Sequence, residues 1–242
     1  MWGGGTVWVS RDNGQVQAHA HHAIQITVAP GPPVRLRKGG AASWLEVTAA
    51  IIMPDRPHQF DGLGRDVMMV FVEPETAAGR ALMTRFGIAD ISTIDDPWML
   101  ERAGTLLRSF AAQARDEAIV QGAREIVDHL AGELPAAPAV DRRITAALAW
   151  ARERLESPVN LGQAAAIANL SPSRFRHLFV AQTGISFRAY LLWARMSHAI
   201  VQGMEGGSWT DAAQQAGFAD SAHLSRTCRR MFGVAPSMIG RE

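Results

Sequence analysis

One pattern occurs twice in the last hundred residues of this 242-residue chain. In each copy, a short alanine-rich segment is followed by a turn residue, a capping residue and a second segment with apolar residues four positions apart. The copies cover residues 160–179 and 208–228, so their starts are 48 residues apart. Residues 186–202 between them have the periodicity of a connecting helix. The repeat predicts two helix-turn-helix units; the alternative is a plain all-helical domain that binds no nucleic acid.

The residue types fit the geometry of such units. Two helices that cross at about 90–120° need a small residue where they touch, and Ala165 and Ala213 stand at that position. Four residues later, the chain must adopt a left-handed conformation, which glycine adopts freely and asparagine tolerates. Asn169 and Gly217 occupy these places. Residues suited to cap the helices follow the same pattern: Ser171 before Pro172, Asp220, and Ser208 with Asp211.

From about Ile144 to Arg241, the sequence resembles the AraC/XylS family of transcription regulators. The segments that carry the resemblance are Leu170–Phe179, Thr183–Tyr190, Arg195, Ala213–Arg226 and Arg229–Ser237. The resemblance implies a DNA-binding domain with two helix-turn-helix units, often preceded by a cupin-like sensor domain.

The resemblance also implies that the helix after Ser171 enters one major groove and the helix after Asp220 enters the next. The implied DNA-binding residues are Ser173, Arg174, Arg176, His177, Ser221, Ala222, Ser225, Arg226 and Arg229. The apolar pattern agrees on the faces, because the apolar residues of both helices must turn inward: Phe175, Leu178, Phe179, Leu224, Cys228 and Phe232. Arg226 is the best candidate for a guanine contact; a phosphate contact is the alternative.

Two positions depart from the family pattern. Cys228 stands where phenylalanine is usual, and we expect a small core residue there rather than a redox sensor. Asn169 replaces the commoner glycine, which the turn tolerates.

Charge is distributed unevenly along the chain. Residues 1–140 contain 12 Lys+Arg and 16 Asp+Glu, a net charge of −4, whereas residues 141–242 contain 12 basic and 7 acidic residues, a net charge of +5. All 12 basic residues of the second part are arginines, whose planar guanidinium groups fork onto phosphate or guanine. The asymmetry favours nucleic acid as the partner of the second part.

The first part is predicted to begin with short strands separated by turns, as in a small antiparallel barrel or sandwich. The expected strands are residues 6–9, 23–28, 45–48, 50–53 and 67–72, and helices are expected at 76–86, 97–115 and 118–133. The predicted fold class is α+β: an N-terminal cupin-like β-barrel with following helices, then an all-α domain with two helix-turn-helix units. Residues 1–134 form the predicted effector-sensing and dimerisation domain, 135–140 a proline-broken linker, and 141–242 the DNA-binding domain.

Helix 97–115 is a candidate dimerisation surface, and packing on the barrel is its alternative. Its apolar face consists of Leu100, Ala103, Leu107, Phe110 and Ala114.

Histidines are the other chemical feature of the first part. His19 and His21 would lie on one strand face, and the distant His58 would be able to complete a metal site, in an arrangement that resembles a degenerate cupin. No glutamate follows the histidine pair at the usual spacing, so no metal and no cofactor is predicted. The candidate effector-binding residues are His21, His22, His58 and Phe60.

These observations predict a DNA-binding transcription regulator that responds to a small-molecule effector and is not an enzyme. Double-stranded operator DNA is the expected partner, the chain is expected to form a homodimer, and RNA polymerase is a further candidate partner. One cysteine, no apolar run of roughly 18 residues and no signal-peptide pattern predict a cytoplasmic protein without membrane contact. The alternatives are a metal-dependent cupin enzyme with an accessory helical domain and a DNA-binding regulator without an effector.

Overall fold

The computed structural model describes residues 2–10, 14–132 and 139–239. The chain divides into two compact units, Met1–Ala137 and Pro138–Glu242, which are described separately. Residues 135–138 of the predicted linker lie outside the described residues. No helix in the described part combines the length and the hydropathy that crossing a bilayer requires.

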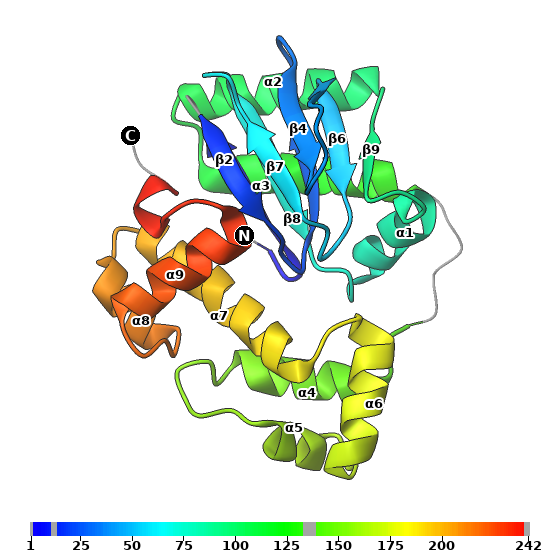
Figure 1. The fold of residues 1–242 in the computed structure, drawn as a ribbon, viewed down its shortest axis with the longest axis vertical. Helices are drawn as coiled ribbons and strands as arrows, with labels where there is room; N and C mark the ends of the chain where they lie inside the picture. Colours follow the sequence, from blue (N-terminus) through cyan, green and yellow to red (C-terminus); the bar gives the residue numbers. More distant parts are fainter. Residues whose placement is uncertain (1, 11–13, 133–138, 240–242) are drawn as a thin grey trace. The chain divides into compact units, whose positions relative to one another are not determined.

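The first unit contains two antiparallel sheets (Figure 1). The five-stranded sheet has the order β1 (Gly5–Ser10), β8 (Val67–Val72), β3 (Ile24–Val28), β6 (Ala49–Ile52) and β9 (Ile91–Thr93). The four-stranded sheet has the order β2 (Gln15–His19), β7 (His58–Asp61), β4 (Val34–Lys38) and β5 (Leu45–Val47). These sheets, followed by helices, confirm the predicted α+β class.

Strand β3 explains how the first unit is layered. Every residue of β3 is buried, because its two faces belong to different parts of the core. Ile24, Ile26 and Val28 pack with the helices that cover the five-stranded sheet, whereas Gln25 and Thr27 point to the opposite face. A second apolar cluster joins residues of both sheets, among them Leu36, Ile52 and Phe60.

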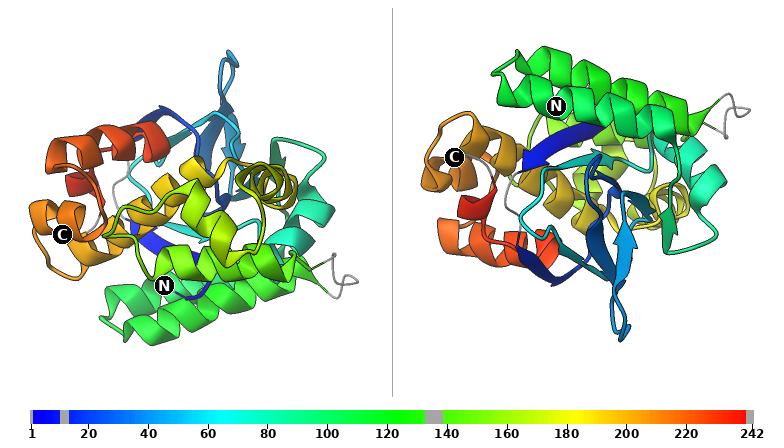
Figure 2. Two further views of the ribbon diagram at one scale, coloured as in Figure 1. Left: turned by 90° about the horizontal axis from the view of Figure 1, so that it is seen from below. Right: turned by 90° about the horizontal axis from the view of Figure 1, so that it is seen from above.

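Three helices complete the first unit: α1 (Ala77–Phe86), α2 (Pro97–Ala111) and α3 (Asp116–Ala131). Helices α2 and α3 lie side by side against the five-stranded sheet (Figure 2). Of the face predicted for dimerisation, Ala103 and Leu107 are buried in this packing, whereas Phe110 is 44% exposed. Helix α2 also ends before the predicted Arg115, because Gln113 has a φ of +57°, which a continuing helix excludes.

The second unit is helical throughout its described residues. Its elements are α4 (Arg142–Arg152), α5 (Leu161–Ile167), α6 (Pro172–Thr183), α7 (Phe187–Met204), α8 (Trp209–Gln215), α9 (Ser221–Phe232) and the 3₁₀ turn η1 (Pro236–Met238). Asp141 caps α4 by accepting a hydrogen bond from the Arg143 amide. Helix α4 ends at Arg152, before Ser157 and Pro158.

Candidate nucleic-acid interface

Helices α5 and α6 form the first predicted helix-turn-helix unit. The side chains of Asn160 and Gln163 cap α5 reciprocally. Asn169 then turns the chain with a φ of +51°, which confirms its predicted left-handed conformation. Ser171 caps α6, and Pro172 occupies the first helical turn, where a missing amide hydrogen has no cost.

An aromatic cluster holds α6 in place. The rings of Phe175 and Phe179 are 5.5 Å apart between centroids, and each lies edge-on to the ring of Phe187 at 5.5 and 5.3 Å. Tyr190 extends the cluster at 5.8 Å from Phe179. Inward packing of this size fixes which face of α6 remains outside.

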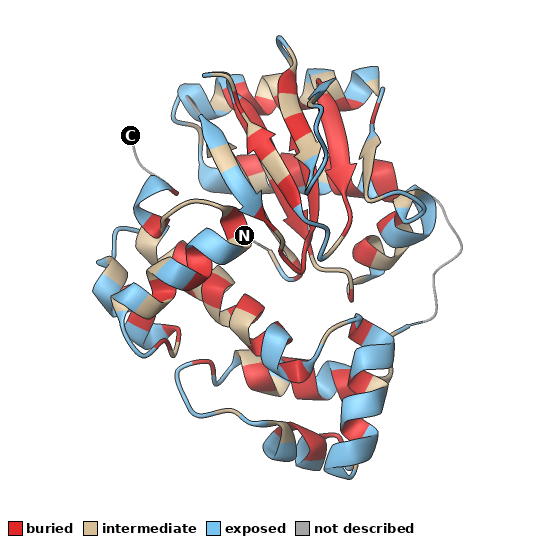
Figure 3. Ribbon diagram, viewed as in Figure 1, coloured by how far each residue is buried: buried red, intermediate tan, exposed pale blue. Residues whose placement is uncertain are grey.

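The outer face of α6 carries the polar residues that the sequence singled out. Ser173, Arg174, Arg176 and His177 are all exposed. Much of α6 has the pale blue colour of exposed residues in Figure 3. The Nδ1 atom of His177 lies 2.9 Å from the carbonyl oxygen of Ser173, so the ring donates this bond through Nδ1–H. Arg174 and His177 also line a shallow hollow with Arg143 of α4.

Helices α8 and α9 repeat the arrangement. Ser208 caps α8 through the Asp211 amide, and Asp220 caps α9 through the His223 amide. Gly217 makes the turn with a φ of +72°, as its position in the repeat predicted. Because both turns adopt the same left-handed step, the repeat is a structural repeat as well as a sequence repeat.

Helix α9 divides into an inner and an outer face. Leu224, Cys228 and Phe232 are buried, as predicted. Ala222, Arg226 and Arg229 are exposed, whereas Ser221 and Ser225 are half-buried. Among the described residues, no carboxylate forms an ion pair with Arg226 or with Arg176 of α6. Both guanidinium groups are therefore available to an external acceptor.

Arg195 and Gly217 connect the two helix pairs. Arg195 on α7 donates hydrogen bonds to the carbonyl oxygens of Leu155, at 3.2 Å, and Ser157, at 3.1 Å, in the turn before α5. Gly217 packs against the same turn, so closely that a Cβ there would lie 2.3 Å from the Leu155 oxygen. The turn between α8 and α9 therefore packs directly against the turn that precedes α5. This contact joins the two helix pairs in addition to the covalent connection through α7.

Cys228 is a buried core residue. Its position favours the predicted small core residue over the alternative of a redox sensor. Its side chain is 0% exposed, and burial raises the pKa of its thiol to about 12. The reactive thiolate is therefore negligible near neutral pH. We expect the native chain to react with a thiol reagent far more slowly than the chain unfolded in denaturant. Equal rates in a timed labelling experiment would contradict the burial of Cys228.

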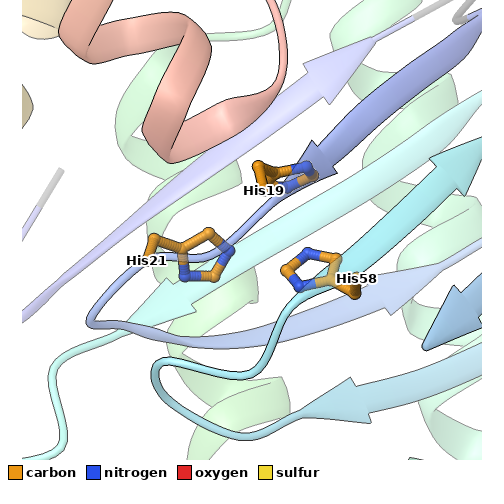
Figure 4. Close-up of side chains that lie close together, drawn as sticks. All are labelled: His19, His21 and His58. Atoms are coloured by element: carbon orange, nitrogen blue, oxygen red, sulfur yellow. The ribbon is translucent and has the colours of Figure 1, made fainter. Parts of the chain in front are cut away.

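Three histidines of the first unit lie close together at one end of the four-stranded sheet (Figure 4). His19 on β2 pairs across the strands with His58 on β7, and His21 follows two residues after His19. Their ring centroids are 4.2 Å apart for His19 and His58, 5.2 Å for His21 and His58, and 5.8 Å for His19 and His21. Burial, followed by the other two imidazoles, lowers the pKa of His58 to about 2, and burial and His21 lower that of His19 to about 4. Burial also lowers the pKa of His21, so the cluster is neutral at pH 7.

The other two predicted effector residues lie elsewhere. His22 Nε2 is 3.0 Å from a carboxylate oxygen of the buried Glu75, and His22 Nδ1 is 3.9 Å from Asp55. Burial alone would lower the pKa of His22, but hydrogen bonds with Asp55 and Glu75 raise it to about 9. Phe60 belongs to the apolar cluster shared by the two sheets. The predicted set therefore separates into a histidine cluster, an ion pair and a core residue.

Sequence reasoning missed two polar residues near the histidines. Gln25 lies 2.9 Å from His21 Nε2 and hydrogen-bonds Thr27, and Glu75 partners His22. The signal for Gln25 was present, since a glutamine inside the fully buried strand Ile24–Val28 requires a polar partner. The pairing of Glu75 with His22 could not be predicted in this way, because the two residues are 53 positions apart in the sequence.

Two capped helix pairs on one connecting helix define a DNA-binding domain of the double helix-turn-helix class. Residues 164–242 match the protein family described as "Helix-turn-helix domain". The uncharacterised HTH-type transcriptional regulator YpdC of Escherichia coli (strain K12) is 30% identical over 88 residues, which are 36% of this chain and 31% of that protein. The match thus covers less than a third of that relative's length.

Solved structures resemble the whole chain. An apo form of ToxT from Vibrio cholerae strain SCE256 superposes with a TM-score of 0.65 at 11% identity, covering 96% of this chain and 94% of that one. ToxT from Vibrio cholerae O395 gives 0.60 at 13% identity over 97% of both chains. The chain therefore has the fold of ToxT, and residues 164–242 match a helix-turn-helix domain.

Proposed function

We propose that this chain is a sequence-specific DNA-binding transcription regulator in which α6 and α9 enter successive major grooves of one duplex. The observation that carries the proposal is the connection between the two helix pairs. Helix α7 and the contacts of Arg195 and Gly217 with the turn before α5 hold both pairs in one unit. Recognition helices held in this way suit consecutive groove faces, which are about 34 Å apart along B-DNA.

The exposed side chains supply the chemistry that DNA recognition needs. Arginines neutralise phosphates and set the register, while a few side chains read base edges. The proposed contact residues are those predicted from the sequence: Ser173, Arg174, Arg176, His177, Ser221, Ala222, Ser225, Arg226 and Arg229. Since Ser221 and Ser225 are half-buried, the arginines and His177 have the longest reach into a groove.

Selection of bound sequences from random duplex DNA by the full chain tests this function. We expect an enriched site with two short elements about one helical turn apart, and footprint protection over both. Equal affinity of the full chain for selected and random duplexes at the same salt concentration would overturn the proposal.

Replacing Arg226 by alanine should lower discrimination between the selected site and random DNA by about 1–3 kcal/mol, the value of a bidentate arginine–guanine pair. Fluorescence anisotropy titrations on both duplexes measure this difference. The matched control is Arg188→Ala on α7, which removes the same charge from another exposed position. If Arg226→Ala weakens both duplexes equally, Arg226 contacts phosphate rather than a base.

The first unit is proposed to bind a small-molecule effector that shifts the DNA-competent population. Support comes from the fold: unsaturated fatty acid-bound ToxT from Vibrio cholerae superposes over 100% of both chains with a TM-score of 0.57 at 11% identity. Thermal unfolding with unsaturated fatty acids as probes tests this part of the proposal. The cupin-like character of this unit, a homodimer, contact with RNA polymerase and a cytoplasmic location remain predictions from the sequence.

A further inference from the structure

We propose that His19, His21 and His58 form a binding site for a divalent first-row transition metal ion, with Zn²⁺ as the first candidate. The site belongs to the first unit and does not depend on the proposed DNA-binding function. It reverses our expectation from the sequence that this part of the chain binds no metal.

The tautomers of the three rings are fixed by backbone carbonyl groups. His19 Nδ1 lies 2.7 Å from the carbonyl oxygen of Gln17, His21 Nδ1 lies 2.9 Å from that of Ala23, and His58 Nδ1 lies 2.8 Å from that of Arg56. A carbonyl oxygen only accepts hydrogen bonds, so all three Nδ1 atoms carry the proton. In His19 and His58 the lone pair is therefore on Nε2, and an Nδ1–H bond to a carbonyl is the usual outer support of a metal-binding histidine. The Nε2 atom of His21 lies 2.9 Å from Oε1 of Gln25, a contact that an ion would have to replace.

The Nε2 atom of His58 is the unsatisfied atom of the cluster among the described residues. It is completely buried and has no hydrogen-bond partner among the described residues. A buried acceptor left without a hydrogen bond is unfavourable. A neighbouring ring nitrogen that is itself an acceptor has no proton to donate to it. A cation shared by the three rings would satisfy all of them at once.

The distances and donor types fit such an ion. One ligand atom from each of the three residues lies within 4.8 Å of the other two. Zinc–nitrogen bonds of about 2.0–2.1 Å in a tetrahedron place nitrogens about 3.3 Å apart, so small ring rotations close the site. Three neutral imidazoles suit zinc, copper, iron or nickel rather than magnesium or calcium.

Gln25 contacts the cluster through His21. Its carboxamide lies 2.9 Å from His21 Nε2, and a bound ion would displace this hydrogen bond and meet the amide oxygen next to it. The nearby carboxylates of Asp55 and Glu75 pair with His22 instead. The site is therefore uncharged apart from the ion, and replacing Gln25 by glutamate would add the negative charge that strengthens binding.

The test uses the full chain without a polyhistidine tag, stripped with chelator and titrated with Zn²⁺ and Co²⁺. We expect one equivalent to bind, Co²⁺ to give the intense visible absorption of a four-coordinate ion, and thermal unfolding to shift upward. His58→Ala should weaken binding by more than about 100-fold, since changes to outer-shell partners alone cost 10–100-fold. The matched control is His198→Ala on α7 of the second unit, which should bind Zn²⁺ as the unchanged chain does.

Gln25→Glu keeps the test informative if His58→Ala fails to fold. We expect Gln25→Glu to be less stable than the unchanged chain without metal, because it buries a charge, and to gain more from added Zn²⁺. The proposal is overturned if the unchanged chain binds no stoichiometric metal. It is equally overturned if His58→Ala folds and binds as well as the unchanged chain, or if Gln25→Glu gains nothing from Zn²⁺.

Discussion

Replacing Gly217 by alanine should destabilise the second unit by about 2–5 kcal/mol. Two effects add at this position. A residue with a Cβ pays about 1–2 kcal/mol in a left-handed conformation, and Gly217 has a φ of +72°. The new Cβ would also lie 2.3 Å from the Leu155 carbonyl oxygen and 3.0 Å from Arg195 Nε, an overpacking that typically costs 1–3 kcal/mol.

Gly184→Ala is the matched control for this experiment. Gly184 ends α6 with a φ of +78°, and a Cβ there would meet nothing within 4 Å. It should therefore show the backbone cost of about 1–2 kcal/mol alone. Urea unfolding, with hydrogen exchange to localise the loss to α4–α9, measures both variants. Equal losses of unfolding free energy in the two variants would show that the packing of Gly217 against the turn before α5 contributes nothing to stability.

Changing the spacing between the two DNA elements should abolish joint binding. Insertion of five base pairs turns the second element to the opposite face of the duplex. Insertion of ten restores the face but adds about 34 Å, whereas the 18 residues of α7 span only about 27 Å in total. We expect both insertions to lower the affinity by at least about 100-fold, toward the affinity for a single element.

The control duplex keeps the original spacing and scrambles only the base pairs between the two elements. It should bind within a few fold of the selected site in the same anisotropy titration. Recovery of full affinity with the ten-base-pair insertion would contradict a rigid connection and would indicate that the two helix pairs move independently.

The second unit was predictable from sequence because its signals are local. Asn169, Gly217 and the capping residues Ser171, Ser208 and Asp220 each act within a few residues of their own position. Apolar residues four apart then fix the inner face of α6 and α9. What the sequence does not contain is the contact of Arg195 and Gly217 with the turn before α5, because it joins residues about 40 or more positions apart.

The sheets of the first unit were harder to predict. Strands β2, β4, β7 and β9 were all missed. In β4, Val-Arg-Leu-Arg-Lys alternates apolar and cationic residues, which is a strand signal that our sequence prediction did not use. Strands β7 and β9 are only four and three residues long, and pairing with β2, β4 and β6 defines them more than their own composition.

The histidine cluster was also predictable only in part: the spacing within one segment could be read from the sequence, whereas the pairing between distant strands could not. His19 and His21 were expected on one face, and His58 was named as the distant third residue. Missing from the sequence was the register that places His58 opposite His19. The three carbonyl partners of Nδ1 depend on backbone paths that spacing alone does not describe.

Helix α9 has one buried face and one exposed face, and this separation affects how such a protein changes during evolution. Leu224, Cys228 and Phe232 hold the helix in place from within, while Ala222 and Arg226 face outward and support no core contact. Substitutions at the outward positions are therefore nearly free of folding cost. Under the proposed DNA-binding function, we expect a lineage to acquire new target genes through these few codons while the scaffold beneath them stays the same.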